Sequence, residues 1–211
     1  MARRKIGEAT TDSHGIATFT YTGEGRGKLQ IVAVQGALES EPQELYDCRI
    51  FDKGISSDNN SSAWTTSNNA SLSYETNYAV IEPNSTKKEL PLSETLIDGD
   101  TIEYDLFLSV DVQDVDDITE INPIYLNFKN NNITKKSIKL SYGTVPLNEW
   151  VHVKIECSIS NTESIIKMTT YDLNAVQKGY GKWKIADSII NKFVWSTETI
   201  EEIRFKNFML Y

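Results

Sequence analysis

Apolar and polar residues alternate with a period of two in two long stretches, residues 101–110 and 150–159. The polar positions include Glu103 and Asp105 in the first stretch and His152 in the second. A period of two gives a β-strand one dry face and one wet face. Both stretches are therefore predicted to be strands that bury one face. The apolar positions are Ile102, Tyr104, Leu106, Leu108 and Val110, then Val151, Val153, Ile155, Cys157 and Ile159.

Shorter β-rich runs separated by polar loops fill the rest of residues 48–211, and none shows a sustained helical period. Many short antiparallel strands of this kind predict an all-β, antiparallel jelly-roll β-sandwich. In the last run the alternation changes phase near Asn207, which predicts a β-bulge. We expect a short helical turn at 186–191. The runs expected as strands are 74–81, 124–128, 137–141, 165–171, 193–195 and 202–211.

The N-terminal residues 1–47 predict a smaller β unit. Strands are expected at 16–21 and 29–34, joined by the glycine-rich loop 23–27, and Asp12 to Gly15 is a turn signal. Because no helix follows the glycines, they lack the helix N-terminus that a phosphate site would need. So few strands cannot close a sandwich alone.

Two segments carry resemblances to known families. Residues 9–17 (ATTDSHGIA), 19–21 (FTY) and 27–33 (GKLQIVA) resemble the C-terminal half of bacterial Ig-like domains of the invasin/intimin type, without that family's first strands. Residues 147–155 (LNEWVHVKI) and 203–208 (IRFKNF) resemble strands of concanavalin-like, laminin-G-like and pentraxin-like sandwiches. The first resemblance implies a partial stalk segment over 1–47. The second implies a lectin-like domain over 48–211 that functions in carbohydrate binding or adhesion.

The charge and composition of the chain limit the classes of binding partner that can be expected. The formal net charge is −9, which disfavours nucleic acid and anionic membrane surfaces. No apolar run reaches membrane-spanning length, and no apolar segment follows the basic N-terminus as a secretory signal would require. We expect an extracellular, cell-surface or virion location, reached through a larger parent chain, a phage particle or lysis. Cys48 and Cys157 leave two alternatives, a disulfide or two free thiols, of which the second is favoured.

A catalytic pair of carboxylates is the first candidate for chemistry. Glu103 and Asp105 share one strand face, as in concanavalin-like glycosidases with a Glu-x-Asp-x-x-Glu motif. The position of that family's acid/base is Leu108, which cannot ionise. We therefore favour a solvated strand face and expect no enzyme activity. The two histidines, His14 and His152, lie in no recognisable nucleophile or metal motif.

An acidic run after the first long strand is a candidate calcium site, since calcium binds six to eight oxygens. Its spacing fits no EF-hand, and the favoured alternative is a solvated acidic loop without any cofactor. The carboxylates of this run are Asp111, Asp114, Asp116 and Asp117.

Aromatic residues in polar or glycine-rich surroundings are candidates for stacking on sugar rings. The alternative for each ring is ordinary packing in the core or at a sheet edge. The candidate ligand-binding rings are Trp64, Tyr78, Tyr180 and Trp183.

These features favour a non-catalytic adhesion or binding module of a cell surface or phage tail that recognises a glycan. Two alternatives remain: a structural decoration or spacer protein, for which a homo-oligomer is expected, and a disfavoured concanavalin-like glycoside hydrolase.

Overall fold

The computed structural model describes residues 4–24, 27–64, 70–83, 88–109, 124–140, 145–197 and 202–211. The chain divides into two compact units, Met1–Cys48 and Arg49–Tyr211.

The first unit contains two small antiparallel pairs. Strand β1 (Gly27–Ile31) pairs with β4 (Gln43–Asp47), and β2 (Val34–Gln35) pairs with β3 (Leu38–Glu39). The predicted turn is confirmed: the Asp12 carboxylate accepts the backbone N–H groups of His14 and Ile16, and Gly15 has a φ of 77°.

The strand predicted at residues 16–21 is wrong. This segment contains no strand, and Ile16 and Phe19 are 62% and 43% exposed. An alternating stretch becomes a strand only where a neighbour completes its backbone ladder. Instead, the Tyr21 hydroxyl and the Glu24 backbone N–H donate hydrogen bonds to the Asp47 carboxylate at the end of β4. The Ig-like identity of this unit stays a prediction.

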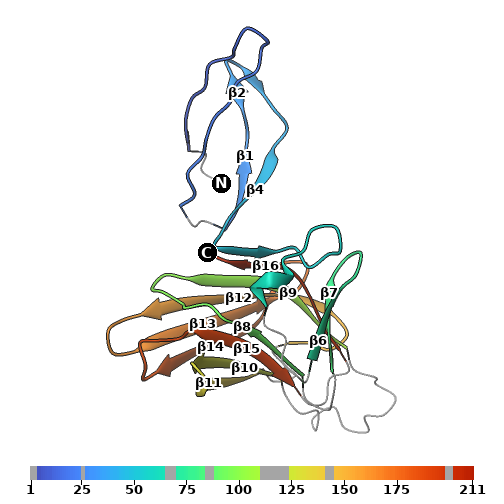
Figure 1. The fold of residues 1–211 in the computed structure, drawn as a ribbon, viewed down its shortest axis with the longest axis vertical. Coiled ribbons are helices and arrows are strands. Elements are labelled where there is room, and N and C mark those ends of the chain that lie inside the picture. Colours follow the sequence, from blue (N-terminus) through green and yellow to red (C-terminus); the bar gives the residue numbers. More distant parts are fainter. Residues whose placement is uncertain are drawn as a thin grey trace. The chain divides into compact units, whose positions relative to one another are not determined.

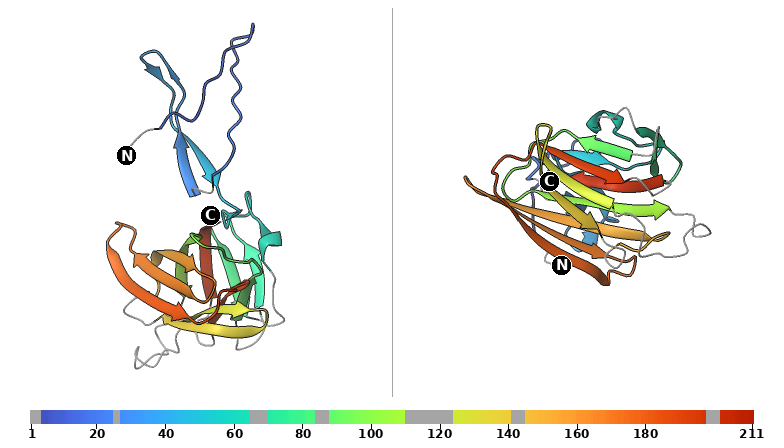
Figure 2. Two further views of the ribbon diagram at one scale, coloured as in Figure 1. Left: turned by 90° about the vertical axis from the view of Figure 1, so that its left-hand side faces the viewer. Right: turned by 90° about the horizontal axis from the view of Figure 1, so that it is seen from below.

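The second unit is a sandwich of two antiparallel sheets (Figures 1 and 2), which confirms the predicted fold class. The larger sheet has the order β14 (Gln177–Ile185), β13 (Ser164–Tyr171), β12 (Trp150–Ile159), β9 (Thr101–Ser109), β16 (Glu202–Leu210), β7 (Ala79–Pro83) and β6 (Ala70–Tyr74), and β5 (Ile50–Asp52) pairs with β16 as its eighth strand. The smaller sheet has the order β11 (Ile133–Leu140), β10 (Ile124–Asn130), β15 (Lys192–Thr197) and β8 (Lys88–Leu92).

Both long alternating stretches are strands, β9 and β12, and they pair with each other in the middle of the larger sheet. Their apolar sides face the smaller sheet and pack against side chains of β10 and β15. Packed rings fill the centre of this core: they are Tyr104, Phe193, Trp195, Phe205 and Phe208. The Trp195 Nε1–H donates to the Tyr104 hydroxyl over 3.1 Å, so the buried indole keeps a partner.

The bulge predicted in the last strand is confirmed. The register of β16 against β9 shifts between Lys206 and Met209, and Asn207 has a φ of 54°. The extra residue allows Phe205 and Phe208 both to face the core, although three positions separate them.

Two further expectations from the sequence are wrong: a single strand at 74–81 and a helical turn at 186–191. Residues 74–81 are not one strand, because the polar run 75–77 forms the turn of a β6–β7 hairpin, closed by a hydrogen bond from Glu75 N–H to the Tyr78 carbonyl. The turn expected at 186–191 is not helical; among the described residues the only helix is the 3₁₀ turn η1 (Ser61–Ala63). No helix in the described ranges has the length and apolar character needed to cross a membrane.

Both cysteines are free, so the disulfide alternative is not formed. Cys157 lies on the inner face of β12 as a small buried apolar residue, and burial raises the pKa of its thiol to about 12. Burial, with the charge of Asp47, raises the pKa of Cys48 to about 11.

Candidate functional site: the outer face of the larger sheet

The outer face of the larger sheet, which points away from the smaller sheet, collects the polar side of the alternating pattern. Strands β12, β9 and β16 are neighbours, and their pairing places His152, Asp105 and Lys206 in one row across the sheet. The next row joins Arg204, Phe107 and Trp150 in the same way. Residues about 100 positions apart therefore become adjacent on one surface.

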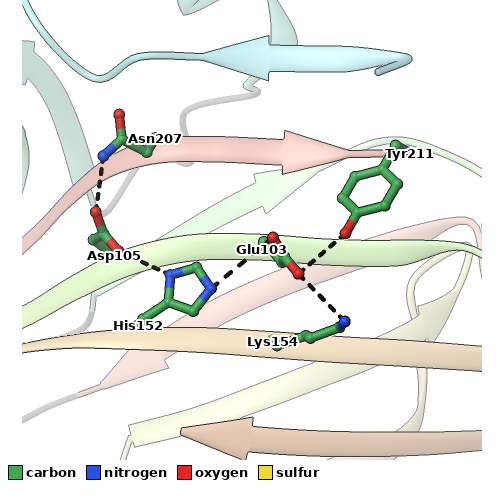
Figure 3. Close-up of polar contacts among 6 residues, drawn as sticks. All are labelled: Glu103, Asp105, His152, Lys154, Asn207 and Tyr211. Atoms are coloured by element: carbon green, nitrogen blue, oxygen red, sulfur yellow. Dashed lines mark hydrogen bonds and ion pairs between the residues drawn. The ribbon is translucent and has the colours of Figure 1, made fainter. Parts of the chain in front are cut away.

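Asp105 is the acceptor at the centre of this face (Figure 3). The His152 Nδ1–H donates to Asp105 Oδ1 over 3.0 Å, and Asn207 Nδ2 donates to Asp105 Oδ2 over 2.8 Å. Asn207 reaches this carboxylate from the bulge of β16, so the irregularity in that strand positions a functional group. Both oxygens of the carboxylate are engaged.

Glu103 is the acceptor one step further along β9. The Tyr211 hydroxyl donates to Glu103 Oε1 over 3.0 Å, and Lys154 Nζ lies 3.5 Å from the same oxygen. His152 Nε2 lies 4.0 Å from Glu103 Oε2, so the imidazole stands between two carboxylates. We call these six residues the polar network: Glu103, Asp105, His152, Lys154, Asn207 and Tyr211.

Burial and contacts within the polar network shift the pKa values of three of its residues. Burial alone would raise the pKa of Asp105, but the hydrogen bonds from His152 and Asn207 outweigh it, and the pKa is lowered. The hydrogen bond to Asp105, helped by the charges of Asp105 and Glu103, raises the pKa of His152 against the opposing effects of burial and Lys154. Burial and then the charge of Glu103 raise the pKa of Tyr211, so its phenol stays a donor.

An aromatic cluster with two cations borders the polar network. The Arg204 guanidinium lies between two rings, 4.9 Å from the centroid of Tyr78 and 4.7 Å from that of Phe107. The Lys206 ammonium lies 4.4 Å from the Trp150 ring. Trp150 in turn lies 5.5 Å from Phe107 and 6.1 Å from Tyr78. We call these five residues the aromatic cluster.

The four rings expected to bind a ligand are not brought together. Trp64 is only 6% exposed, stacks on Trp195 at 5.3 Å and donates its Nε1–H to Asp52 over 2.8 Å. It belongs to the core, and the expectation of an accessible ring there is not met. Trp183 is half-buried on the inner side of β14, where it covers Gly181; a Cβ at Gly181 would lie 2.0 Å from the indole.

The other two rings lie on the outer face at opposite ends of the sheet. Tyr78 belongs to the aromatic cluster beside β7, and Tyr180, 57% exposed, lies on β14. Strands β13, β12, β9 and β16 separate β14 from β7. Five strand spacings correspond to about 24 Å between the backbones of β14 and β7.

The expected metal ligands Asp111, Asp114, Asp116 and Asp117 lie outside the described residues. Within the described ranges, no group of three or more His, Cys, Asp or Glu side chains is arranged to hold a metal ion. Calcium binding stays a prediction.

Most residues of this face were missed by sequence reasoning. Trp150 and Phe107 are apolar residues at positions where their strands otherwise carry polar side chains. This departure from the alternation was the one local signal that could have identified them. Arg204, Asn207 and Tyr211 carried no such signal, because their relation to Asp105 and Glu103 depends on the pairing of the last strand with β9.

The expected carboxylate pair, Glu103 and Asp105, is present on one face. A general acid in glycoside cleavage needs a raised pKa to deliver its proton near neutral pH. The pKa of Asp105 is lowered instead, and Leu108 is buried in the core. The face offers fixed hydrogen-bond acceptors and donors beside aromatic rings.

No protein-family model and no curated protein sequence matches this chain. Solved structures with a similar course of the chain include lectin I-B4 from Griffonia simplicifolia in its metal-free form, with a TM-score of 0.48 and 5% identity over 71% of this chain and 93% of the lectin. The metal-free exoplasmic/lumenal domain of VIP36 aligns with a TM-score of 0.42 and 8% identity over 75% and 93%.

The receptor binding domain of botulinum neurotoxin type G aligns with a TM-score of 0.43 and 13% identity over 70% of this chain. That match spans 42% of the neurotoxin domain, less than half of its length. VIP36 has also been solved in a Ca²⁺/Man-bound form. At these identities and TM-scores, neither a family nor a residue role is transferred to this chain.

Proposed function

We propose that this protein is a non-catalytic binding module whose outer face recognises a carbohydrate. The supporting observation is the meeting of the polar network and the aromatic cluster on one side of a rigid sheet. Sugar rings stack their C–H faces on aromatic side chains, while carboxylate, amide and imidazole groups fix their hydroxyls. Both kinds of group are present within a few strand spacings.

Side chains on strands hold their positions better than side chains on loops, because the backbone ladder fixes them. The contacts between Asp105, His152 and Asn207 lock three rotamers before any ligand arrives. Less conformational entropy is then lost on binding, which favours recognition of a polar ligand.

The direct test is binding of the full chain to a glycan array, compared with the Trp150→Ala variant. We expect a defined set of glycans to bind and the variant to lose most of the signal, because the central ring of the aromatic cluster is removed. Tyr125→Ala is the matched control: this ring is 36% exposed on the smaller sheet and should leave binding unchanged. Absence of binding to every glycan would refute the proposal.

A glycosidase is the alternative that a simple assay separates. Release of reducing sugar from a bound glycan, abolished by Glu103→Gln, would replace a binding role by a catalytic one. A spacer or decoration protein would instead self-associate without binding glycans, which light scattering on the full chain would reveal.

We also propose that the module acts outside a cell or on a virion such as a phage tail, with residues 1–47 as an Ig-like stalk segment. Labelled full chain should bind intact cells, and the free glycan found on the array should compete. Calcium at Asp111, Asp114, Asp116 and Asp117 remains part of this proposal; equal melting midpoints with calcium and with chelator would remove it.

A further inference from the structure

The third part of the outer face lies on β13 and β14 and is rich in lysine. Lys167 on β13 and Lys182 on β14 are direct register partners, and both project to the outer face. The Cβ atoms of such partners lie about 5 Å apart, and like charges placed there destabilise a sheet. The arrangement costs free energy unless something negative compensates it.

Neighbouring lysines have acidic partners, but this pair does not. Lys184 pairs with Glu163 and Lys178 with Asp172. Among the described residues, neither Lys167 nor Lys182 forms an ion pair with a carboxylate. Their two ammonium groups are therefore available to a ligand.

One acid, Glu156, is in register with Lys167. Glu156 on β12 is the register partner of Lys167 on the side away from Lys182. Its charge acts on Tyr211, where it adds to the effects of burial and Glu103 that raise the pKa of the phenol. The opposite charge of Glu156 offsets part of the repulsion at Lys167, whereas Lys182, among the described residues, is in register only with Lys167.

Protection of the sheet edge explains only part of this pattern. Lysines on an exposed edge strand prevent pairing with another chain, and β14 is the end strand of the larger sheet. That explanation covers Lys182 and Lys184. It does not cover Lys167, because β13 is an interior strand with β12 and β14 on its two sides.

A ring lies beside the lysine pair. Tyr180 projects from β14 to the same face two residues before Lys182, about 6.6 Å along the strand, and is in register with Thr169. A sugar stacked on Tyr180 would direct a substituent over Lys182 and Lys167. In a protein with a net charge of −9, such a local pair of cations is what an anionic ligand needs for favourable contact.

We infer that Tyr180, Lys167 and Lys182 form a subsite for a negatively charged substituent, so that the outer face selects acidic glycans over neutral ones. The inference rests on the proposed carbohydrate-binding function and names its ligand class. Tyr180 supplies the stacking surface, and the two ammonium groups bind a carboxylate or sulfate on the same sugar or the next one.

The test uses matched pairs of oligomers that differ only in charge. Oligogalacturonate is compared with its methyl ester, and dextran sulfate with dextran, which separates carboxylate from sulfate as the anion. Affinities are measured by calorimetry on the full chain and on the double variant Lys167→Gln/Lys182→Gln. The control is Lys139→Gln, which removes an exposed lysine from the smaller sheet.

We expect the wild type to prefer at least one acidic oligomer over its neutral counterpart, and the double variant to lose about tenfold in affinity for it, as for the loss of two charge-assisted contacts. Affinity for neutral glycans should not change. Because both lysines are at the surface, the double variant should fold, which a melting curve checks.

Four results would overturn the inference. Equal affinity of the wild type and the double variant for the acidic oligomer would exclude the lysine pair. Equally tight binding of single-stranded DNA would indicate a general polyanion surface. Binding of neutral glycans alone would refute the acidic selectivity but leave the proposed function intact, whereas absence of any glycan binding would refute both.

Discussion

The two faces of the larger sheet use aromatic rings and carboxylates in opposite ways. On the core side, Trp64 and Tyr74 both donate to the carboxylate of Asp52, which is almost fully buried and also accepts the backbone N–H of Gly54. On the outer side, Asp105 accepts from His152 and Asn207 at the surface. Both carboxylates are satisfied, but the first is buried in the core and the second lies on the outer face.

The difference shows that the type of residue alone does not indicate its role. A tryptophan in a polar stretch, such as Trp64, can complete a core, while a tryptophan at the start of a regular strand, such as Trp150, can lie on a surface. What separates them is the side of the sheet and the partner beyond it. Changes on the core side should therefore have the largest effects on stability, and changes on the outer side should alter binding with smaller effects on stability.

The largest effect on stability is expected for Trp64→Ala. Removing a buried indole should lower the free energy of unfolding by about 3–5 kcal/mol, and Asp52 also loses a donor. The measurement is urea unfolding followed by tryptophan fluorescence; the four tryptophans all lie in the unit Arg49–Tyr211. Tyr125→Ala serves as control. A variant that unfolds like the wild type yet loses glycan binding would return Trp64 to the binding surface.

A smaller loss of stability is expected for Asp105→Ala. His152 and Asn207 then lose their common acceptor in a half-buried place, which should cost about 1–3 kcal/mol of stability. The matched control is Asp58→Ala, at an exposed carboxylate whose ion-pair partner Lys53 is also exposed, with a change within about 0.5 kcal/mol. Equal unfolding midpoints for the two variants would mean that the polar network does not stabilise the sheet.

The pH dependence of stability tests the charge state of the network. The raised pKa of His152 means that its stabilising contribution is fully present below the unfolded value of about 6.5 and is lost as pH rises through the folded value. The lowered pKa of Asp105 gives a contribution that is present above about 3.9 and is lost as pH falls through the folded value. His152→Gln should flatten the decline above pH 6.5.

The chain has two histidines, so His14→Gln is the natural control for that experiment. Urea unfolding across pH 5–9 should give the same profile for His14→Gln and the wild type. A decline that persists unchanged in His152→Gln would assign it to other groups.

The smallest effect on stability is expected for Tyr180→Ala. This exposed ring should contribute less than about 0.5 kcal/mol to folding, while stacking on a sugar is worth up to about 1.5 kcal/mol. Melting temperature and glycan affinity measured on the same preparation should therefore separate, with the first unchanged and the second reduced. A fall in melting temperature without a loss of affinity would make Tyr180 a structural residue.

Part of the fold could be predicted because its signals are local. The alternation over β9 and β12 and the change of phase at Asn207 are properties of consecutive residues. By contrast, β14 was missed because its glycines and lysines lack the β-branched residues that mark most strands, and β8 contains Pro91, which an end strand tolerates.

The candidate site was predictable only in fragments. Tyr78 and Tyr180 were identified as rings, and Glu103 and Asp105 as carboxylates on one face, but nothing in the sequence joins them. Their neighbours come from β12, β13 and β16, and the strand order that places these side by side is not encoded in any one segment.

The sequence by itself determined which side chains of each strand share a face, because the pleat repeats every two residues. The tertiary structure alone decided which strands are neighbours, and hence that His152 lies between Glu103 and Asp105 and that Trp64 is buried. The physical reason is that backbone pairing and core packing join residues far apart in the chain, and their free energies depend on the whole sheet.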